Sequence, residues 1–81
     1  MSNHLVCRDV GPRAITELYR KFPNMADCQI ARLVGVERKT IGYWKTGVVA
    51  PSTFALKALC HYGLDIKYIL TGIRGGYLNG N

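Results

Sequence analysis

Residues 27–47 read DCQIARLVGVERKTIGYWKTG, and this stretch contains the most informative pattern in the chain. Apolar side chains recur at helical spacing in its first half, namely Ile30, Ala31 and Val34. They predict a short helix with one buried side, which starts at Asn24 or Ala26. Gly35 comes directly after this apolar pattern, where a left-handed C-terminal cap would end the helix.

A second helix is expected over about residues 38–46, with Gly47 as its end. Ile41 and Trp44 are spaced so that both side chains face the first helix. The other side is polar and basic, and it carries Arg38, Lys39, Gly42, Tyr43 and Lys45. A glycine inside a helix costs roughly 1 kcal/mol relative to alanine, so we expect Gly42 to lie close to a neighbouring backbone. Two short helices joined by a tight turn are typical of a helix-turn-helix, whose second helix enters the major groove of DNA.

Three further helices are expected around this pair, and they make the chain all-α. The first opens at Gly11-Pro12, and its apolar face consists of Ala14, Ile15, Leu18, Tyr19 and Phe22. The fourth starts at Pro51-Ser52 and ends at Gly63, with an apolar side formed by Phe54, Ala55, Ala58, Leu59 and Tyr62. The fifth is short and runs from a cap at Asp65 to Gly72, and its apolar residues are Ile66, Ile69 and Leu70.

The length of 81 residues allows one domain. We expect a loose polar arm over residues 1–9, the helical domain over residues 10–72, and a glycine- and asparagine-rich tail over residues 73–81. The tail is expected to be flexible, or to form an extended strand when it is paired. A domain of this size has a small core, so dimerisation would add to its stability.

The charge of the chain favours a polyanionic partner. Eleven Lys or Arg stand against five Asp or Glu, which gives a net charge of +6. Nucleic acid is the common partner of such a domain, and a membrane surface is the competitor. No apolar run approaches the ~20 residues that span a bilayer, and residues 1–10 lack the pattern of a secretory signal. We therefore expect a cytoplasmic protein with no membrane partner.

The sequence shows no arrangement of residues typical of catalysis or metal binding. There are no paired carboxylates at helical spacing, no nucleophile with a base and no phosphate-binding glycine loop. Cys7, Cys28 and Cys60 are widely spaced and offer neither a disulfide framework nor a Cys-x-x-Cys metal pair. We expect a protein that is not an enzyme and uses no cofactor, metal or small-molecule substrate. Its cysteines are expected to be reduced, with Cys60 in the core.

The combined pattern resembles the DNA-binding domain of phage CI and Cro repressors, in the lambda-repressor-like XRE family. The resemblance rests on residues 30–36, 40–41, 44–47 and 63–72, and it covers about residues 12–74. It implies a five-helix helix-turn-helix domain that regulates transcription in a bacterial host by binding a two-fold operator in double-stranded DNA as a homodimer. Two alternatives stay open: an antitoxin-type repressor that also binds a toxin, and a protein-interaction adaptor on the same fold.

The resemblance also implies roles for individual positions. The places that read bases are taken by Arg38, Lys39 and Tyr43. The places that hold backbone phosphates are taken by Asp27, Thr40, Lys45 and Thr46. Many members have a glutamine at the position of Asp27, and a carboxylate there would repel phosphate, so capping of the helix is its alternative role.

The homodimer is expected because a single reading helix touches only a few base pairs, so such proteins commonly double the site. The apolar surface for pairing is predicted on the fifth helix and the tail, at Ile66, Ile69, Ile73, Tyr77 and Leu78. Two copies related by a two-fold axis would bind an operator with the same two-fold symmetry.

Overall fold

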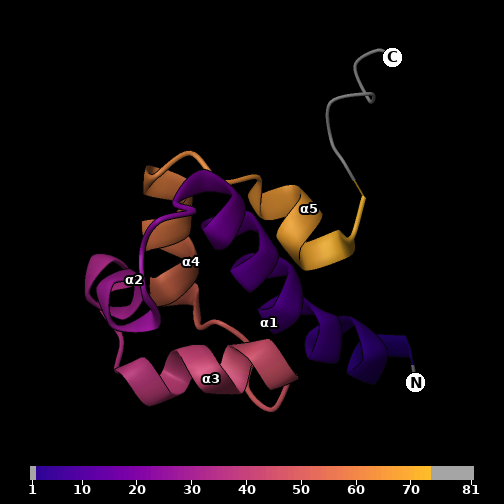
Figure 1. The fold of residues 1–81 in the computed structure, drawn as a ribbon. Coiled ribbons are helices and arrows are strands. Elements are labelled where there is room, and N and C mark those ends of the chain that lie inside the picture. Colours follow the sequence, from indigo (N-terminus) through magenta and orange to yellow (C-terminus); the bar gives the residue numbers. More distant parts are fainter. Residues whose placement is uncertain (1, 74–81) are drawn as a thin grey trace.

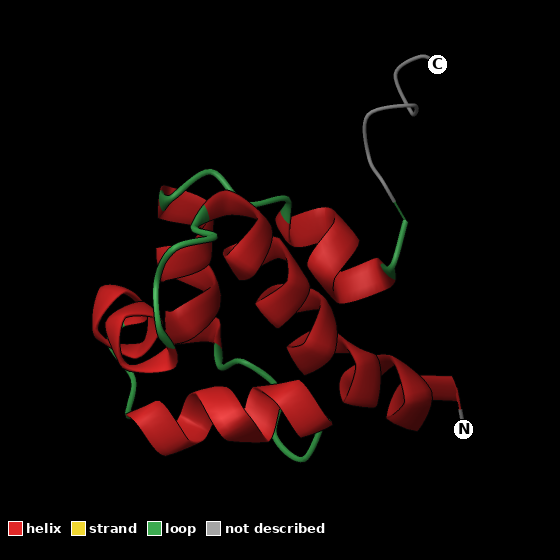
Figure 2. Ribbon diagram, viewed as in Figure 1, coloured by secondary structure: helices red, strands yellow, loops and turns green. Residues whose placement is uncertain are grey.

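A computed structural model describes residues 2–73 of the chain, and the side chains of residues 8–73. Within that part the chain is all-helical, as predicted, with short loops between the helices (Figure 2). The helices are α1 (Ser2–Lys21), α2 (Asp27–Val34), α3 (Arg38–Thr46), α4 (Thr53–His61) and α5 (Ile66–Thr71). The helix α1 contacts both α3 and α5, while α2 contacts α3 and α4 (Figure 1). None of the helices in the described part is long and apolar enough to cross a membrane.

All five helices, with the turn before α5, contribute to one hydrophobic core. Its buried members are Val10, Ala14, Leu18, Ile30, Ala31, Val34, Ile41, Trp44, Ala55, Leu59, Leu64 and Ile69. Trp44 is the largest fully buried side chain. The predicted inner faces of α2 and α3 are confirmed, because Ile30, Val34 and Ile41 are buried as the helical spacing requires.

The helix α4 corrects two predictions about burial. Phe54, predicted on the apolar side, is 76% exposed, and Cys60, predicted in the core, is an exposed thiol. The face of α4 that packs into the core runs through Ala55 and Leu59, which lie one turn apart. Phe54 directly precedes Ala55 in the sequence and Cys60 directly follows Leu59, so the helix turns both side chains away from the core.

The helix α1 corrects the predicted N-terminal boundary. It begins at Ser2, not at Gly11-Pro12, so residues 2–9 are helical where a loose arm was expected. Pro12 lies inside the helix and has no N–H group, which leaves the carbonyl of Arg8 without its usual helical donor. This carbonyl lies against Gly47, where an added Cβ would be 2.6 Å from the oxygen of Arg8. Docking against α3 therefore stabilises a helix that the proline alone would interrupt.

Glycine allows α1 and α3 to meet backbone to backbone. A Cβ added to Gly11 would lie 2.5 Å from the carbonyl oxygen of Trp44 and 2.9 Å from its Cα. The close approach predicted for Gly42 is wrong, because a Cβ at that position would meet nothing within 4 Å. The crossing of α1 over α3 thus depends on Gly11 and Gly47, while the space beside Gly42 is open.

Local hydrogen bonds define where the helices begin and end. The backbone N–H of Ala55 donates to the hydroxyl of Ser52 at 3.1 Å, so α4 starts after Ser52 and not at Pro51. The carboxylate of Asp65 accepts from the N–H of Tyr68 at 3.0 Å, which confirms the predicted cap of α5. Gly35 ends α2 with a φ of 89°, the left-handed conformation that favours glycine.

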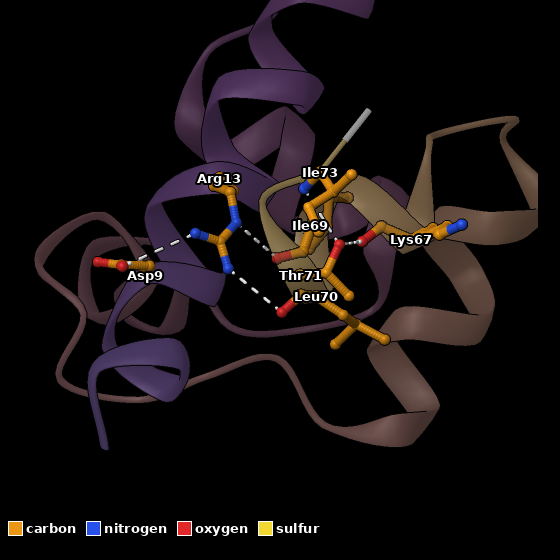
Figure 3. Close-up of polar contacts among 7 residues, drawn as sticks. All are labelled: Asp9, Arg13, Lys67, Ile69, Leu70, Thr71 and Ile73. Atoms are coloured by element: carbon orange, nitrogen blue, oxygen red, sulfur yellow. Dashed lines mark hydrogen bonds and ion pairs between the residues drawn. The ribbon is translucent and has the colours of Figure 1, made fainter. Parts of the chain in front are cut away.

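Arg13 fastens the C-terminal end of α5 to α1 (Figure 3). Its Nε donates to the carbonyl of Ile69 at 2.8 Å, and its Nη2 donates to the carbonyl of Leu70 at 3.2 Å. Its Nη1 also lies 3.7 Å from a carboxylate oxygen of Asp9, one turn earlier on α1. The last carbonyls of a helix lack intrahelical donors, so a cation there satisfies them and interacts favourably with the helix dipole.

Candidate nucleic-acid interface

The helix α3 presents one apolar and one basic side. Ile41 and Trp44 are fully buried and hold α3 against the body of the protein. Arg38 and Lys39 in the first turn are exposed, and Tyr43 is 44% exposed. Because Lys39 and Tyr43 are four residues apart, they lie one above the other on the helix surface. The structure therefore brings all three residues predicted to read bases to the solvent-facing side of one helix.

The two cations in the first turn of α3 are available to a ligand. Arg38 makes no hydrogen bond or ion pair with any other described residue. Lys39 lies 3.5 Å from a carboxylate oxygen of Glu37, but these side chains are 70% and 74% exposed. Solvent screens an ion pair of this kind, so it contributes little to stability and can be exchanged for a phosphate or a base.

The residues predicted to hold phosphates lie in three different environments. Thr46 is exposed, and its hydroxyl donates to the carbonyl of Tyr43 at 3.2 Å. Thr40 is half-buried near the start of α3. Lys45 donates to the carboxylate of Asp27 at 2.6 Å, so these two predicted phosphate contacts are bonded to each other.

Asp27 does not cap α2. It is the first residue of the helix, and the N-cap residue is Ala26, whose N–H donates to the side chain of Gln29 at 2.8 Å. The carboxylate of Asp27 instead accepts two hydrogen bonds, one from the hydroxyl of Tyr19 on α1 and one from the ammonium group of Lys45. Sequence reasoning missed Tyr19, because it was assigned only to the apolar face of its helix and nothing in the local pattern pairs it with Asp27.

An exposed apolar group follows α3. Val48 and Val49 lie in the loop that leaves α3, and Phe54 lies in the first turn of α4. All three are among the exposed large apolar side chains of the described residues. The two valines were not predicted to be functional, because short apolar runs in loops are common and carry no helical spacing.

The predicted dimer surface is only partly exposed. Ile69 is fully buried in the core beside the end of α5 that Arg13 fastens, so its assignment to a pairing surface is wrong. Ile66 is half-buried and packs against the core, and Ile73 is 48% exposed. Tyr77 and Leu78, like the rest of the tail beyond Ile73, lie outside the described residues.

Metal ligands do not gather at this interface or elsewhere among the side chains of residues 8–73. No three His, Cys, Asp or Glu side chains there form a group that could hold an ion. Cys28 on α2 and Cys60 on α4 are both free and exposed.

Comparison with known proteins places the chain among regulators of transcription. Neither the search of curated proteins nor the search of solved structures gave a match. The family model described as transcriptional cell cycle regulator TrcR matches residues 5–61, from the first turn of α1 to the end of α4. This is more than half of the chain, and it includes α2, the turn at Gly35 and all of α3. The predicted role in transcription is thus confirmed at the level of the family, and the chain belongs to the TrcR family of transcriptional cell cycle regulators.

Proposed function

We propose that the chain is a sequence-specific DNA-binding protein that places α3 in the major groove. The observation that carries the proposal is the basic side of α3, where Arg38, Lys39 and Tyr43 are exposed opposite a fully buried apolar side. In this proposal α2, the turn at Gly35 and α3 act as a helix-turn-helix, with α3 as the reading helix. Membership in a family of transcriptional regulators supports a role for that surface in the control of genes.

Arg38 is the residue on which we expect specificity to depend most. Its guanidinium is exposed and has no partner among the described residues, so no intramolecular bond is lost when it binds a base. An arginine can donate two parallel hydrogen bonds to the edge of a guanine. Lys39 would bind a guanine or a phosphate, and Tyr43 would pack on a thymine methyl group or bond to a phosphate.

We further propose that the protein binds DNA as a homodimer on a two-fold operator, in the manner of the phage repressors that the sequence resembles. A single reading helix contacts only a few base pairs, and two copies with half-sites roughly 34–36 Å apart would read the same face of the duplex. Ile73 is the predicted dimer residue that stays most exposed in the described part of the chain, so pairing would involve the region that follows α5.

The first experiment is selection from a pool of random DNA duplexes at near-physiological salt, followed by sequencing. A two-fold symmetric motif is the expected result. On that motif, Arg38→Ala should weaken binding about ten-fold to a hundred-fold, since one bidentate contact discriminates by roughly 1–3 kcal/mol. Arg38→Lys should lose most of the same affinity, because it keeps the charge and loses the fork of donors.

Lys57→Ala is the matched control, because Lys57 is an exposed cation on α4 that has no partner among the described residues. It should weaken binding only slightly, through the loss of one positive charge that does not belong to α3. Equal effects of Arg38→Ala and Lys57→Ala would show that binding is unspecific attraction and would contradict the proposed reading helix.

A role as a protein-interaction adaptor is the second candidate, and the exposed apolar group of Val48, Val49 and Phe54 favours it. Exposed apolar side chains mark a protein contact where they form one patch on the surface. The selection experiment separates the two candidates, because an adaptor would recover no DNA motif.

A further inference from the structure

The carboxylate of Asp27 joins three helices at the candidate interface. It lies at the start of α2 and accepts a hydrogen bond from the hydroxyl of Tyr19 on α1. It also accepts a hydrogen bond, at 2.6 Å, from the ammonium group of Lys45 in the last turn of α3. The side chains of Lys45 and Asp27 are 43% and 32% exposed, so the pair lies at the surface but is partly shielded from water.

The position of Lys45 is determined by two partners. Besides the carboxylate of Asp27, its ammonium group lies 5.8 Å from the centre of the Tyr19 ring. A cation over the face of a tyrosine ring at that distance is attracted by the electrons of the ring. Lys45 thus differs from Lys39, whose only partner among the described side chains is the carboxylate of Glu37, in a pair that water largely screens.

Moving Lys45 to a DNA phosphate would have an electrostatic cost. The ammonium group would leave both partners, and the carboxylate of Asp27 would remain unneutralised beside the polyanion. A negative charge close to phosphates repels them, so the gain from the new contact would be offset. While the pair stays intact, its two charges nearly cancel as seen from the DNA.

We infer that Asp27 is a positioning residue of the DNA-binding surface. It holds the C-terminal end of α3 in place through its ion pair with Lys45, and this pair keeps Lys45 from contacting the phosphate backbone of DNA. This inference rests on the proposed function and assigns Lys45 a role within the fold. Binding would then depend mainly on the exposed cations in the first turn of α3, Arg38 and Lys39, so most contacts with DNA would be made at that end of the helix.

The test is the salt dependence of binding to a duplex that carries the selected motif. The slope of log K against log salt concentration, expressed per protomer, changes by about 0.9 for each phosphate contact that one protomer makes, which is about 1.8 for the homodimer. Lys45→Met should leave the wild-type slope unchanged, whereas Lys39→Met should lower its magnitude by about 0.9 if that cation binds phosphate. Asp27→Asn should raise the magnitude by about 0.9, because it frees Lys45 to bind a phosphate.

Two control variants separate this effect from changes in net charge or folding. Asp65→Asn removes the carboxylate at the N-cap of α5 and keeps a side chain that can cap the helix, so its slope should equal that of the wild type. The double variant Asp27→Asn with Lys45→Met has the net charge of the wild type, and we expect the wild-type slope from it. It also keeps the test usable if Lys45→Met alone does not fold, because no unpaired carboxylate remains.

Each outcome decides the inference. A lower slope for Lys45→Met, matching Lys39→Met, would show that Lys45 binds phosphate and would overturn it. An unchanged slope for Asp27→Asn would overturn it too, because it would show that Asp27 does not keep Lys45 from contacting a phosphate. Failure of the wild-type protein to bind the selected or any random duplex would overturn the proposed function and the inference together, whereas the first two results leave DNA binding itself intact.

Discussion

Replacing two glycines by alanine should shift the stability of the fold in opposite directions. Gly11 and Gly42 both lie inside helices, where alanine is favoured over glycine by about 1 kcal/mol. At Gly42 the new methyl group would meet nothing within 4 Å, so the helical preference should act alone. At Gly11 it would lie 2.5 Å and 2.9 Å from two backbone atoms of Trp44, which cannot rotate away as a side chain would.

The magnitudes follow from these surroundings. Gly42→Ala should raise the free energy of unfolding by about 1 kcal/mol, which corresponds to roughly 4–8 °C in Tm for a domain of this size. Overpacking costs typically 1–3 kcal/mol, and the rigid contacts at Gly11 favour the upper end of that range. After the helical gain is subtracted, Gly11→Ala should lower the free energy of unfolding by about 2 kcal/mol.

Urea unfolding followed by far-ultraviolet circular dichroism measures both variants against the wild type. The expected difference between the two variants is about 3 kcal/mol. If Gly11→Ala were as stable as Gly42→Ala, α1 and α3 would not meet backbone to backbone at Gly11, and the proposed role of this glycine in the crossing would be refuted.

Two further predictions concern the core and the docking of α5. Arg13→Met should lower the free energy of unfolding by about 2 kcal/mol in the same urea assay, because the carbonyls of Ile69 and Leu70 lose a charged donor; stability equal to the wild type would show that this contact does not hold α5. Phe54→Ser should change the free energy of unfolding by no more than about 0.5 kcal/mol, because Phe54 is 76% exposed. Leu59→Ala, on the buried face of the same helix, should cost about 2–5 kcal/mol, and comparable losses for both would place Phe54 in the core.

The parts of the fold that depend on local rules were predictable from the sequence. The helix α3 begins at Arg38 and ends before Gly47, as expected. A left-handed cap and a helical apolar pattern are properties of a few adjacent residues, so the sequence alone predicts them. Ile41 and Trp44 identified the buried side of α3 for the same reason, and this in turn identified the exposed basic side as the candidate interface.

The errors arise where distant residues decide the outcome. Pro12 normally begins a helix, and its place inside α1 depends on the contact of Arg8 with Gly47, far along the chain. Ile69 lies in a helix of six residues, in which the apolar pattern is too short to separate a core face from a pairing surface. The ion pair of Asp27 with Lys45 joins two helices whose relative placement no local pattern specifies.

The missing hydrogen bond at Pro12 has a consequence for the order in which the protein folds. Helices shorter than about 12–15 residues are marginal in water on their own, and the proline separates the first turns of α1 from the rest of that helix. Those turns gain their stability from the contact with α3, so we expect them to form after α3 has docked and not before. The N-terminal segment of α1 would then be the last part of the helix to acquire hydrogen-exchange protection during refolding, and the first to lose it when α3 moves.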